Sequence, residues 1–156
     1  MGEGGITIEL MQVSELHSLV MNISLRYFNK PYKGEVIFNA RLRTTGGRYL
    51  PGKYLIELNP KYYLEASEAE FIGIIKHELC HYHLHNENKP FGHGDIEFKE
   101  LLKRTGSPRF CQPLVSQWKE PIIYKCRKCS MIYPRKRKVN TKRYSCGKCR
   151  GKLELQ

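Results

Sequence analysis

The segment 71–85, FIGIIKHELCHYHLH, is the strongest constraint on what this chain can fold into. It contains an H-E-x-x-H pattern, in which His77 and His81 are four residues apart. On a helix the two imidazoles lie on one face, and neutral imidazole nitrogen is a common zinc ligand. Glu78 follows the first histidine and can take a proton from water without binding the ion. The pattern therefore predicts a helical zinc site with a catalytic general base.

The residues around this pattern predict a buried helix. Ser67 and Glu70 have the spacing of a capping box, so we expect the helix to begin near Glu68. An apolar stripe precedes the histidines by one to two turns and indicates packing against a core. The stripe consists of Phe71, Ile74 and Ile75. A solvent-exposed polar stripe that contains H-E-x-x-H by chance is the alternative, and these features argue against it.

The other two histidines of the segment are poorly placed to complete the site. At about 100° per residue, His83 points away from the face that carries His77 and His81. His85 returns to that face, but it lies about 12 Å along the helix axis from His77, too far to share one ion. We therefore expect the third ligand to come from beyond the helix.

The sequence after the helix offers three candidates for this ligand. Residues 86–92 include a proline and a glycine and are typical of a turn that ends a helix. His93 follows between two glycines, which let the backbone bend toward the metal, and it is the favoured ligand. Asp95 and Glu97 are the alternatives, because carboxylates also bind catalytic zinc.

The chain of 156 residues has room for one domain and a small appendage, which we place at 1–120 and 121–156. The only tryptophan, Trp118, is expected to pack at their junction. The segment 121–156 holds twelve Lys or Arg residues and one acid, Glu154, for a formal +11 of the net +12. A near-neutral body with a basic appendage indicates a polyanionic partner.

Composition also limits the compartment. No apolar run approaches the roughly 20 residues of a membrane span, so no membrane partner is expected. The start, MGEGGITIEL, lacks the charged and apolar regions of a secretory signal. Four of the six cysteines form C-x-x-C pairs, whereas Cys80 and Cys111 are isolated and are expected to be small buried thiols. A reducing cytoplasm is the simplest setting for this pattern.

The two C-x-x-C pairs predict a second metal site of a different kind. Sixteen residues separate the pairs, and this arrangement is typical of a zinc ribbon with a short hairpin between its two knuckles. Four thiolates leave no open position on the ion, so this zinc should stabilise the fold and not catalyse. The predicted ligands are Cys126, Cys129, Cys146 and Cys149.

The expected hairpin concentrates positive charge between the knuckles. Cations there can contact phosphates, and the interleaved Tyr133 and Tyr144 can stack on unpaired bases. We favour nucleic-acid contact over the alternative of a solvated, solubilising charge run. The candidate contact residues are Arg135, Lys136, Arg137, Lys138, Lys142 and Arg143.

The rest of the chain indicates an α+β fold. Apolar residues spaced by three or four predict helices over 12–28 and 95–104. Alternating apolar residues predict strands over 35–43 and 53–59, which we expect to pair as a small antiparallel sheet. The intervening 44–52 contains two glycine-rich turn signals. An edge strand of this sheet can pair with an extended peptide, or the strands can serve the core alone.

With these residues described, the chain resembles the SprT-like family, whose members join a minimal zincin metalloprotease domain to a zinc ribbon. The DNA-repair protease Spartan shares the zincin part. The resemblance rests on ARLRTTGGRYLPGKYLIELNPKYY (40–63), on HELCHYHLH, on FGHGDIEF and on the paired C-x-x-C knuckles. It is closest to the short bacterial members and covers most of the chain.

The resemblance implies roles for particular residues. His77, His81 and His93 would bind a catalytic zinc, and Glu78 would be the general base. Single-stranded or irregular DNA would be an activating partner, and DNA-bound protein the substrate. The leading hypothesis is thus a zinc metallopeptidase. A non-catalytic, zinc-containing nucleic-acid-binding module and a zinc hydrolase of non-peptide bonds are the alternatives.

Overall fold

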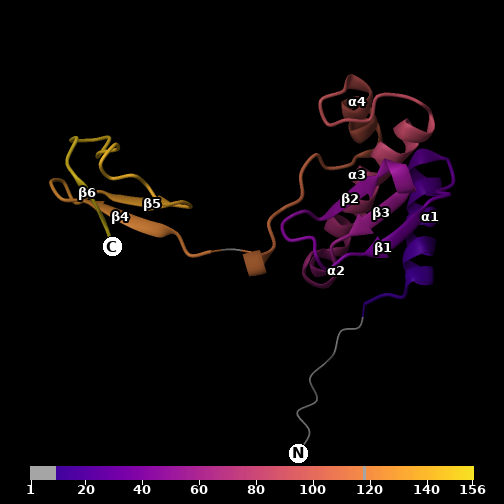
Figure 1. Cartoon of the computed structure of the whole chain (residues 1–156), viewed down its shortest axis with the longest axis horizontal. Helices are drawn as coiled ribbons and strands as arrows, with labels where there is room; N and C mark the ends of the chain where they lie inside the picture. The colour runs from indigo at the N-terminus through magenta and orange to yellow at the C-terminus, as the bar shows by residue number, and fades with distance from the viewer. Residues whose placement is uncertain (1–9, 118) are drawn as a thin grey trace, which may run out of the picture. The chain divides into compact units, whose positions relative to one another are not determined.

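A computed structural model describes residues 10–117 and 119–156, and Trp118 lies outside these ranges. The chain divides into two compact units, Met1–Val115 and Ser116–Gln156 (Figure 1). The sequence predicts units of 1–120 and 121–156, whereas the division here falls before Ser116. None of the helices in the described ranges has the length and apolar character needed to cross a membrane.

The first unit combines helices with a small sheet, which confirms the α+β fold class. Helices α1 and α3 pack on the sheet and on each other, and α4 packs on α3 (Figure 1). The elements are α1 (Val13–Phe28), β1 (Glu35–Phe38), β2 (Gly47–Leu50), the 3-10 turn η1 (Pro51–Lys53), β3 (Leu55–Leu58), α2 (Pro60–Glu65), α3 (Glu68–Asn86) and α4 (Ile96–Thr105).

The sheet has the order β1-β3-β2, and this differs from the expected antiparallel pair. The strands predicted at 35–43 and 53–59 pair in parallel, with Glu35 opposite Leu55. Parallel neighbours cannot be joined by a tight turn. The connection instead forms β2, which pairs antiparallel with β3 and was predicted as a turn. The turn prediction for 44–52 is therefore wrong over β2.

Two glycines explain why β2 was mistaken for a turn. A Cβ on Gly46 would lie 2.7 Å from Cδ1 of Ile74, and a Cβ on Gly47 would lie 3.1 Å from the carbonyl oxygen of Glu57. Glycine here provides a close approach to α3 and β3, not a reversal of the chain. Beyond Gly47, the Arg48 guanidinium bonds the carboxylate of Glu57 directly across the strand pair.

Helix α3 begins where the capping box predicts. The Ser67 side chain accepts a hydrogen bond from the Glu70 N–H, and the Glu70 side chain accepts one from the Ser67 N–H. The preceding α2 was not predicted, although Asn59 caps it and Pro60 occupies its first turn, as is common at helix starts. The predicted helices at 12–28 and 95–104 are confirmed as α1 and α4.

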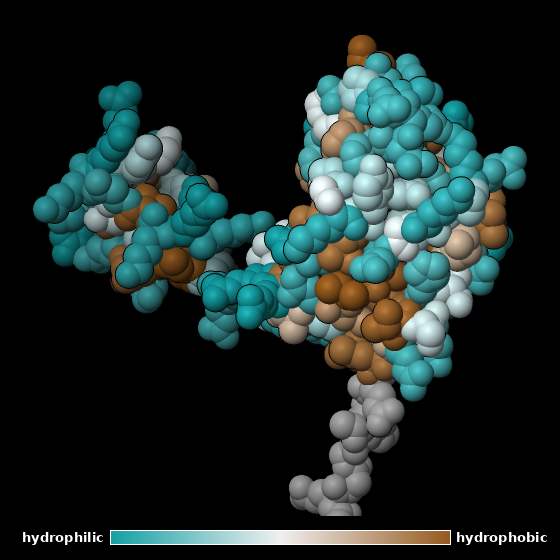
Figure 2. Space-filling model, turned by 45° about the vertical axis from the view of Figure 1, so that its right-hand side comes forward, coloured by the Kyte–Doolittle hydropathy of each residue, from teal (hydrophilic) through white to brown (hydrophobic). Residues whose placement is uncertain are grey.

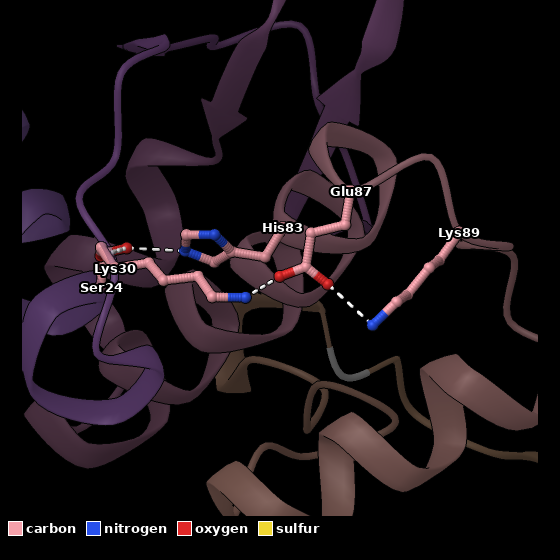
Figure 3. Close-up of polar contacts among 5 residues, drawn as sticks. All are labelled: Ser24, Lys30, His83, Glu87 and Lys89. Atoms are coloured by element: carbon pink, nitrogen blue, oxygen red, sulfur yellow. Dashed lines mark hydrogen bonds and ion pairs between the residues drawn. The ribbon is translucent and has the colours of Figure 1, made fainter.

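A polar cluster fastens α1 to the C-terminal half of α3 (Figure 3). The Ser24 hydroxyl donates a hydrogen bond to the Lys30 carbonyl at 2.6 Å, so its oxygen accepts a hydrogen bond from Nε2–H of His83 at 2.7 Å. Glu87 forms ion pairs with Lys30 and with Lys89. This explains the position of His83, which contacts α1 and lies outside the metal group.

The second unit is a three-stranded antiparallel sheet with the order β5-β4-β6. The strands are β4 (Ile122–Cys126), β5 (Ile132–Arg135) and β6 (Leu153–Leu155), and the short turn η2 (Val115–Gln117) precedes them. The predicted hairpin between the knuckles is wrong. The first knuckle turns the chain from β4 to β5, and 136–152 contains no strand. Hydrophilic residues dominate this unit's visible face in Figure 2.

Candidate metal centres and the cavity beside them

Three histidines of the first unit converge on one point. Nε2 of His93 lies 3.1 Å from Nε2 of His77 and 3.2 Å from Nε2 of His81. Nitrogen ligands in a tetrahedron with bonds of about 2.0–2.1 Å would be roughly 3.3 Å apart. The three side chains form one of two groups of potential metal ligands in the described chain. Their spacing therefore suits a small ion such as zinc.

Backbone carbonyls set the tautomers of the two helical histidines. Nδ1 of His77 donates to the Pro108 carbonyl at 2.8 Å, and Nδ1 of His81 donates to the Phe91 carbonyl at 2.6 Å. A carbonyl can only accept, so both Nε2 atoms carry bare lone pairs that face His93. His93 can offer one Nε2 proton at most. A cation satisfies all three nitrogens, whereas hydrogen bonds alone cannot.

A buried phenyl ring supports all three imidazoles. Phe98 of α4 is fully buried and stacks on His81, with ring centroids 4.2 Å apart and an interplanar angle of 22°. It meets His77 and His93 edge to face, each at 5.3 Å. Sequence reasoning assigned Phe98 only to the apolar face of a helix. Its contact with the site depends on how α4 packs, and helical periodicity does not show that.

Glu78 faces the cavity beside the three histidines. Glu78 is only 6% exposed as a residue and, within the described ranges, its side chain makes no hydrogen bond or ion pair. It lines a cavity of about 590 Å³ together with His77, His81 and His93. Burial raises the pKa of Glu78 to about 8, and a cation held by the three neighbouring imidazoles would lower this pKa and favour the carboxylate form. An unpaired carboxylate in a cavity next to a metal group is placed to accept a proton from water.

The electrostatics of the histidines suit metal binding. Burial lowers the pKa of His81 to about 4, and the hydrogen bond to the Phe91 carbonyl only partly opposes this effect. Burial likewise lowers the pKa of His77. Both imidazoles are therefore neutral near pH 7, which is the form that binds metals.

The structure does not bring the other candidate ligands to this point. Asp95 accepts the Gly92 N–H at 2.8 Å and closes the turn before α4. Glu97 is exposed in the first turn of α4. Nδ1 of His85 is 2.7 Å from the Tyr49 hydroxyl, so His85 ties α3 to β2. Among the alternatives for the third ligand, the geometry favours His93.

Two segments form walls of the cavity. One is the edge strand β2, which contributes Gly47, Arg48 and Tyr49. The other is the segment 108–111, which follows α4 and includes Cys111. The prediction of a buried thiol is correct for Cys80 but wrong for Cys111, which is exposed at the cavity wall. The reason is that 108–111 runs along the surface between α3 and β2.

The second unit contains the four-cysteine group. The Sγ atoms of Cys126 and Cys149 are 3.4 Å apart, and those of Cys129 and Cys146 are 3.6 Å apart. A tetrahedral zinc with bonds of about 2.3 Å would place the sulfur atoms roughly 3.8 Å apart. None of these thiols forms a disulfide. The donor set and its spacing therefore fit a structural zinc ion.

Two residues beside the four cysteines, Tyr133 and Gly151, favour metal binding by this group. The Tyr133 hydroxyl lies 3.0 Å from Sγ of Cys146 and accepts the Gly147 N–H at 3.2 Å. Its hydrogen bond lowers the pKa of Cys146 to about 6. A Cβ on Gly151 would lie 2.7 Å from Sγ of Cys126, so only glycine fits there. Sequence reasoning considered Tyr133 for base stacking and missed its contact with the thiol.

The candidate nucleic-acid residues lie at the end of β5 and in the loop that follows. Val139 anchors this loop through its N–H, which donates to the Tyr124 hydroxyl at 2.9 Å. Tyr144 is 55% exposed, and the Arg143 guanidinium lies over its ring. The end of β5 and this loop, together called the basic loop 135–143, carry Arg135, Lys136, Arg137, Lys138, Lys142 and Arg143, none of which forms an ion pair among the described residues.

Fold and site together define a small α+β protein with two candidate metal centres, one of three histidines and one of four cysteines. Residues 16–117 match the SprT-like family. A "Protein SprT-like" of Oceanobacillus iheyensis is 62% identical over 141 residues, which cover 90% of this chain and 94% of that protein. A Bacillus cereus protein of the same name is 52% identical over 146 residues, covering 92% and 96%. The chain belongs to the SprT-like family.

A solved structure is more distantly similar. The crystal structure of the metallopeptidase zymogen of Pyrococcus abyssi abylysin matches with a TM-score of 0.44 and 19% identity. The match covers 60% of this chain and 78% of that one.

Proposed function

We propose that this protein is a cytoplasmic zinc-dependent metallopeptidase that associates with nucleic acid. The observation that carries the proposal is the unpaired, buried carboxylate of Glu78 beside three converging imidazole nitrogens. His77, His81 and His93 would hold the catalytic zinc, and the four cysteines would hold a structural one. Zinc bound by three imidazoles lowers the pKa of water and polarises a carbonyl group.

The chain's own residues supply the remaining parts of the reaction. Glu78 accepts the proton of the attacking water and passes it to the leaving amine. The edge strand β2 lines the cavity and, among the described residues, has a partner strand on one side only, so its other side offers backbone groups to an extended peptide. The peptide bond to be cleaved then lies beside the histidine group.

The test is the substitution Glu78→Gln in the full chain. It removes the general base but keeps the side chain's size and the three histidines. We expect two zinc ions per chain, as in the wild type, and peptidase activity reduced by about 10²–10⁴-fold. Glu97→Gln is the matched control, because it changes an exposed carboxylate of α4 and should retain activity. Full activity of Glu78→Gln would exclude this mechanism.

We further propose that the basic loop 135–143 binds DNA, with single-stranded DNA favoured over double-stranded DNA. The proposed substrates of the peptidase are proteins bound to that DNA. Cations that form no ion pair among the described residues support phosphate contact, and exposed Tyr144 supports stacking on unpaired bases. Replacing residues 135–138 by glutamate should weaken binding and flatten its dependence on salt by about 0.7 per lost phosphate contact. Lys99→Glu, on α4, is the control in the other unit. If the charge-reversed variant bound DNA as tightly as the wild type, the basic loop would not be part of the DNA-binding surface.

The alternative is a non-catalytic, zinc-containing nucleic-acid-binding module. The exposed basic loop is equally consistent with the module and with the peptidase. The buried Glu78 has a role only in the peptidase. Cleavage of a DNA-binding protein that requires single-stranded DNA and is lost in Glu78→Gln would decide for the peptidase. DNA binding by a zinc-loaded chain that cleaves neither proteins nor peptides would decide for the module.

A further inference from the structure

Gly73 is a glycine inside the long helix α3, four residues before His77. Glycine is the poorest helix former after proline, and alanine is the best. The backbone gives no reason for glycine here, because Gly106 alone among the described glycines has a left-handed conformation. The reason must therefore be the space that a side chain would occupy.

Pro108 occupies that space. A Cβ on Gly73 would lie 3.1 Å from both Cγ and Cδ of Pro108, which is tighter than most packing contacts of a Cβ atom. A proline ring is tied to its own backbone, so it cannot rotate away as a flexible side chain can. A Cβ at position 73 therefore requires Pro108 to shift by a few tenths of an ångström, and the segment that contains Pro108 has to follow.

The displaced backbone includes the group that orients a metal ligand. The Pro108 carbonyl accepts the Nδ1 proton of His77 at 2.8 Å and so directs the Nε2 lone pair toward His93. Gly73 and His77 are one turn apart on the same face of α3, so one segment covers both. The same segment also approaches Gly46, the residue before β2, because a Cβ on Gly46 would lie 3.0 Å from Sγ of Cys111.

We propose that Gly73 is a positioning residue of the three-histidine metal site. Its missing side chain lets Pro108 approach α3 closely enough for the carbonyl to fix the tautomer and direction of His77. Loss of an outer hydrogen bond of this kind typically weakens metal binding by 10–100-fold. The proposal rests on metal binding at this site and does not require that the protein be a peptidase.

The experiment is a double-mutant cycle on the full chain, read out as metal affinity. Gly73→Ala should weaken binding at the histidine site by about tenfold. Pro108→Ala removes the two ring atoms but keeps the carbonyl, so Gly73→Ala with Pro108→Ala should regain most of that affinity. Gly52→Ala is the matched control, because a Cβ there meets nothing within 4 Å and Gly52 does not line the cavity of the histidine site. Its affinity should equal that of the wild type.

Cobalt(II) separates the two metal sites in one titration. Thiolate ligands give an intense charge-transfer band, whereas an imidazole site gives only weak ligand-field bands. The thiolate band should be the same in all variants. The imidazole ¹⁵N spectrum of the wild type adds a reading that needs no variant, and it should show His77 protonated at Nδ1.

Four outcomes would overturn the proposal. The first is that Gly73→Ala and the wild type bind metal at the histidine site with equal affinity, and the second is that Pro108→Ala does not restore the affinity lost in Gly73→Ala. The third is that His77 is protonated at Nε2, and the fourth is that the wild type binds no metal at the histidines. The last would also overturn the proposed peptidase, whereas the first three leave it standing.

Discussion

The ring of Phe98 lies against the ring of His81, with centroids 4.2 Å apart and planes inclined by 22°. This contact joins α4 to the helix that carries the H-E-x-x-H pattern. It means that the hydrophobic core and the metal group share a side chain. Packing and metal binding should therefore change together when Phe98 is altered.

Phe98→Leu should weaken metal binding at the histidine site and reduce the free energy of unfolding by about 1.5 kcal/mol. The smaller side chain leaves His77, His81 and His93 without their common support. Chelator competition and urea unfolding would measure the two effects. Phe28→Leu is the matched control, since Phe28 is also buried and stacks on His83 at 4.8 Å, away from the metal group. Equal metal affinity of the two variants would show that the phenyl ring has no special role.

Ser24→Ala should lower the free energy of unfolding by about 1–3 kcal/mol, because it leaves buried His83 without its acceptor. Ser18→Ala is a suitable comparison. Ser18 makes an exposed hydrogen bond to the Ser14 carbonyl at 3.0 Å, and its loss should change stability by less than about 0.5 kcal/mol. Thermal or urea unfolding of both variants checks this. If Ser24→Ala were as stable as Ser18→Ala, the polar cluster would not stabilise the packing of α1 on α3.

Glu57 should contribute to the acid sensitivity of the first unit. Burial alone would raise its pKa, but hydrogen bonds from Arg48 and Asn39 outweigh burial and hold the pKa below 4.5. A group with a lowered folded pKa adds stability above its unfolded pKa, and this is lost as pH falls through the folded pKa. Stability should therefore decline below pH 4.5.

Glu57→Gln should lower the free energy of unfolding at pH 7 and reduce the loss of stability between pH 7 and pH 3. Glu100→Gln, at an exposed position of α4, should show the same loss of stability with falling pH as the wild type. Urea unfolding at a series of pH values between 3 and 7 measures the slopes. Identical slopes for the wild type and Glu57→Gln would show that the Arg48–Glu57 pair is not formed in solution.

Tyr133→Phe should loosen metal at the four-cysteine group, because it removes the hydroxyl that bonds Sγ of Cys146. Loss of such an outer partner typically costs 10–100-fold in metal affinity. Tyr144→Phe removes an equivalent hydroxyl at an exposed position and should leave metal affinity unchanged. The rate of zinc release to a chelator compares the two. Equal release rates would mean that the Tyr133 hydroxyl does not support the thiolate.

The parts of this protein that follow local chemical rules could be predicted from the sequence. The start of α3 follows from Ser67 and Glu70, and the common face of His77 and His81 follows from helix geometry. The pairing of β1 with β3 could not be predicted, because strand direction depends on a connection whose glycines serve packing as well as turns. Gly46 and Gly47 look the same in both roles until α3 is in place.

The residues that support the histidine site could not be predicted from the sequence either, because their role depends on tertiary packing. The carbonyls of Phe91 and Pro108 orient two histidines, yet any residue type supplies a carbonyl, so the sequence carries no signal for them. Phe98 looks like any core residue of an amphipathic helix. Cys111 was placed in the core because small thiols usually are, whereas the path of 108–111 along the surface exposes it.

The ligands of each metal group are near neighbours along the chain. His77 and His93 are 16 residues apart, and Cys126 and Cys149 are 23 apart. Closing short loops costs little chain entropy, and a difference of this size adds only a few tenths of a kcal/mol. Each group can therefore capture its ion during folding without waiting for the other. With zinc at both groups, slow stripping of metal should release the two ions in separate steps, and loss of the four-cysteine ion should unfold the second unit, whose hydrophobic core is small.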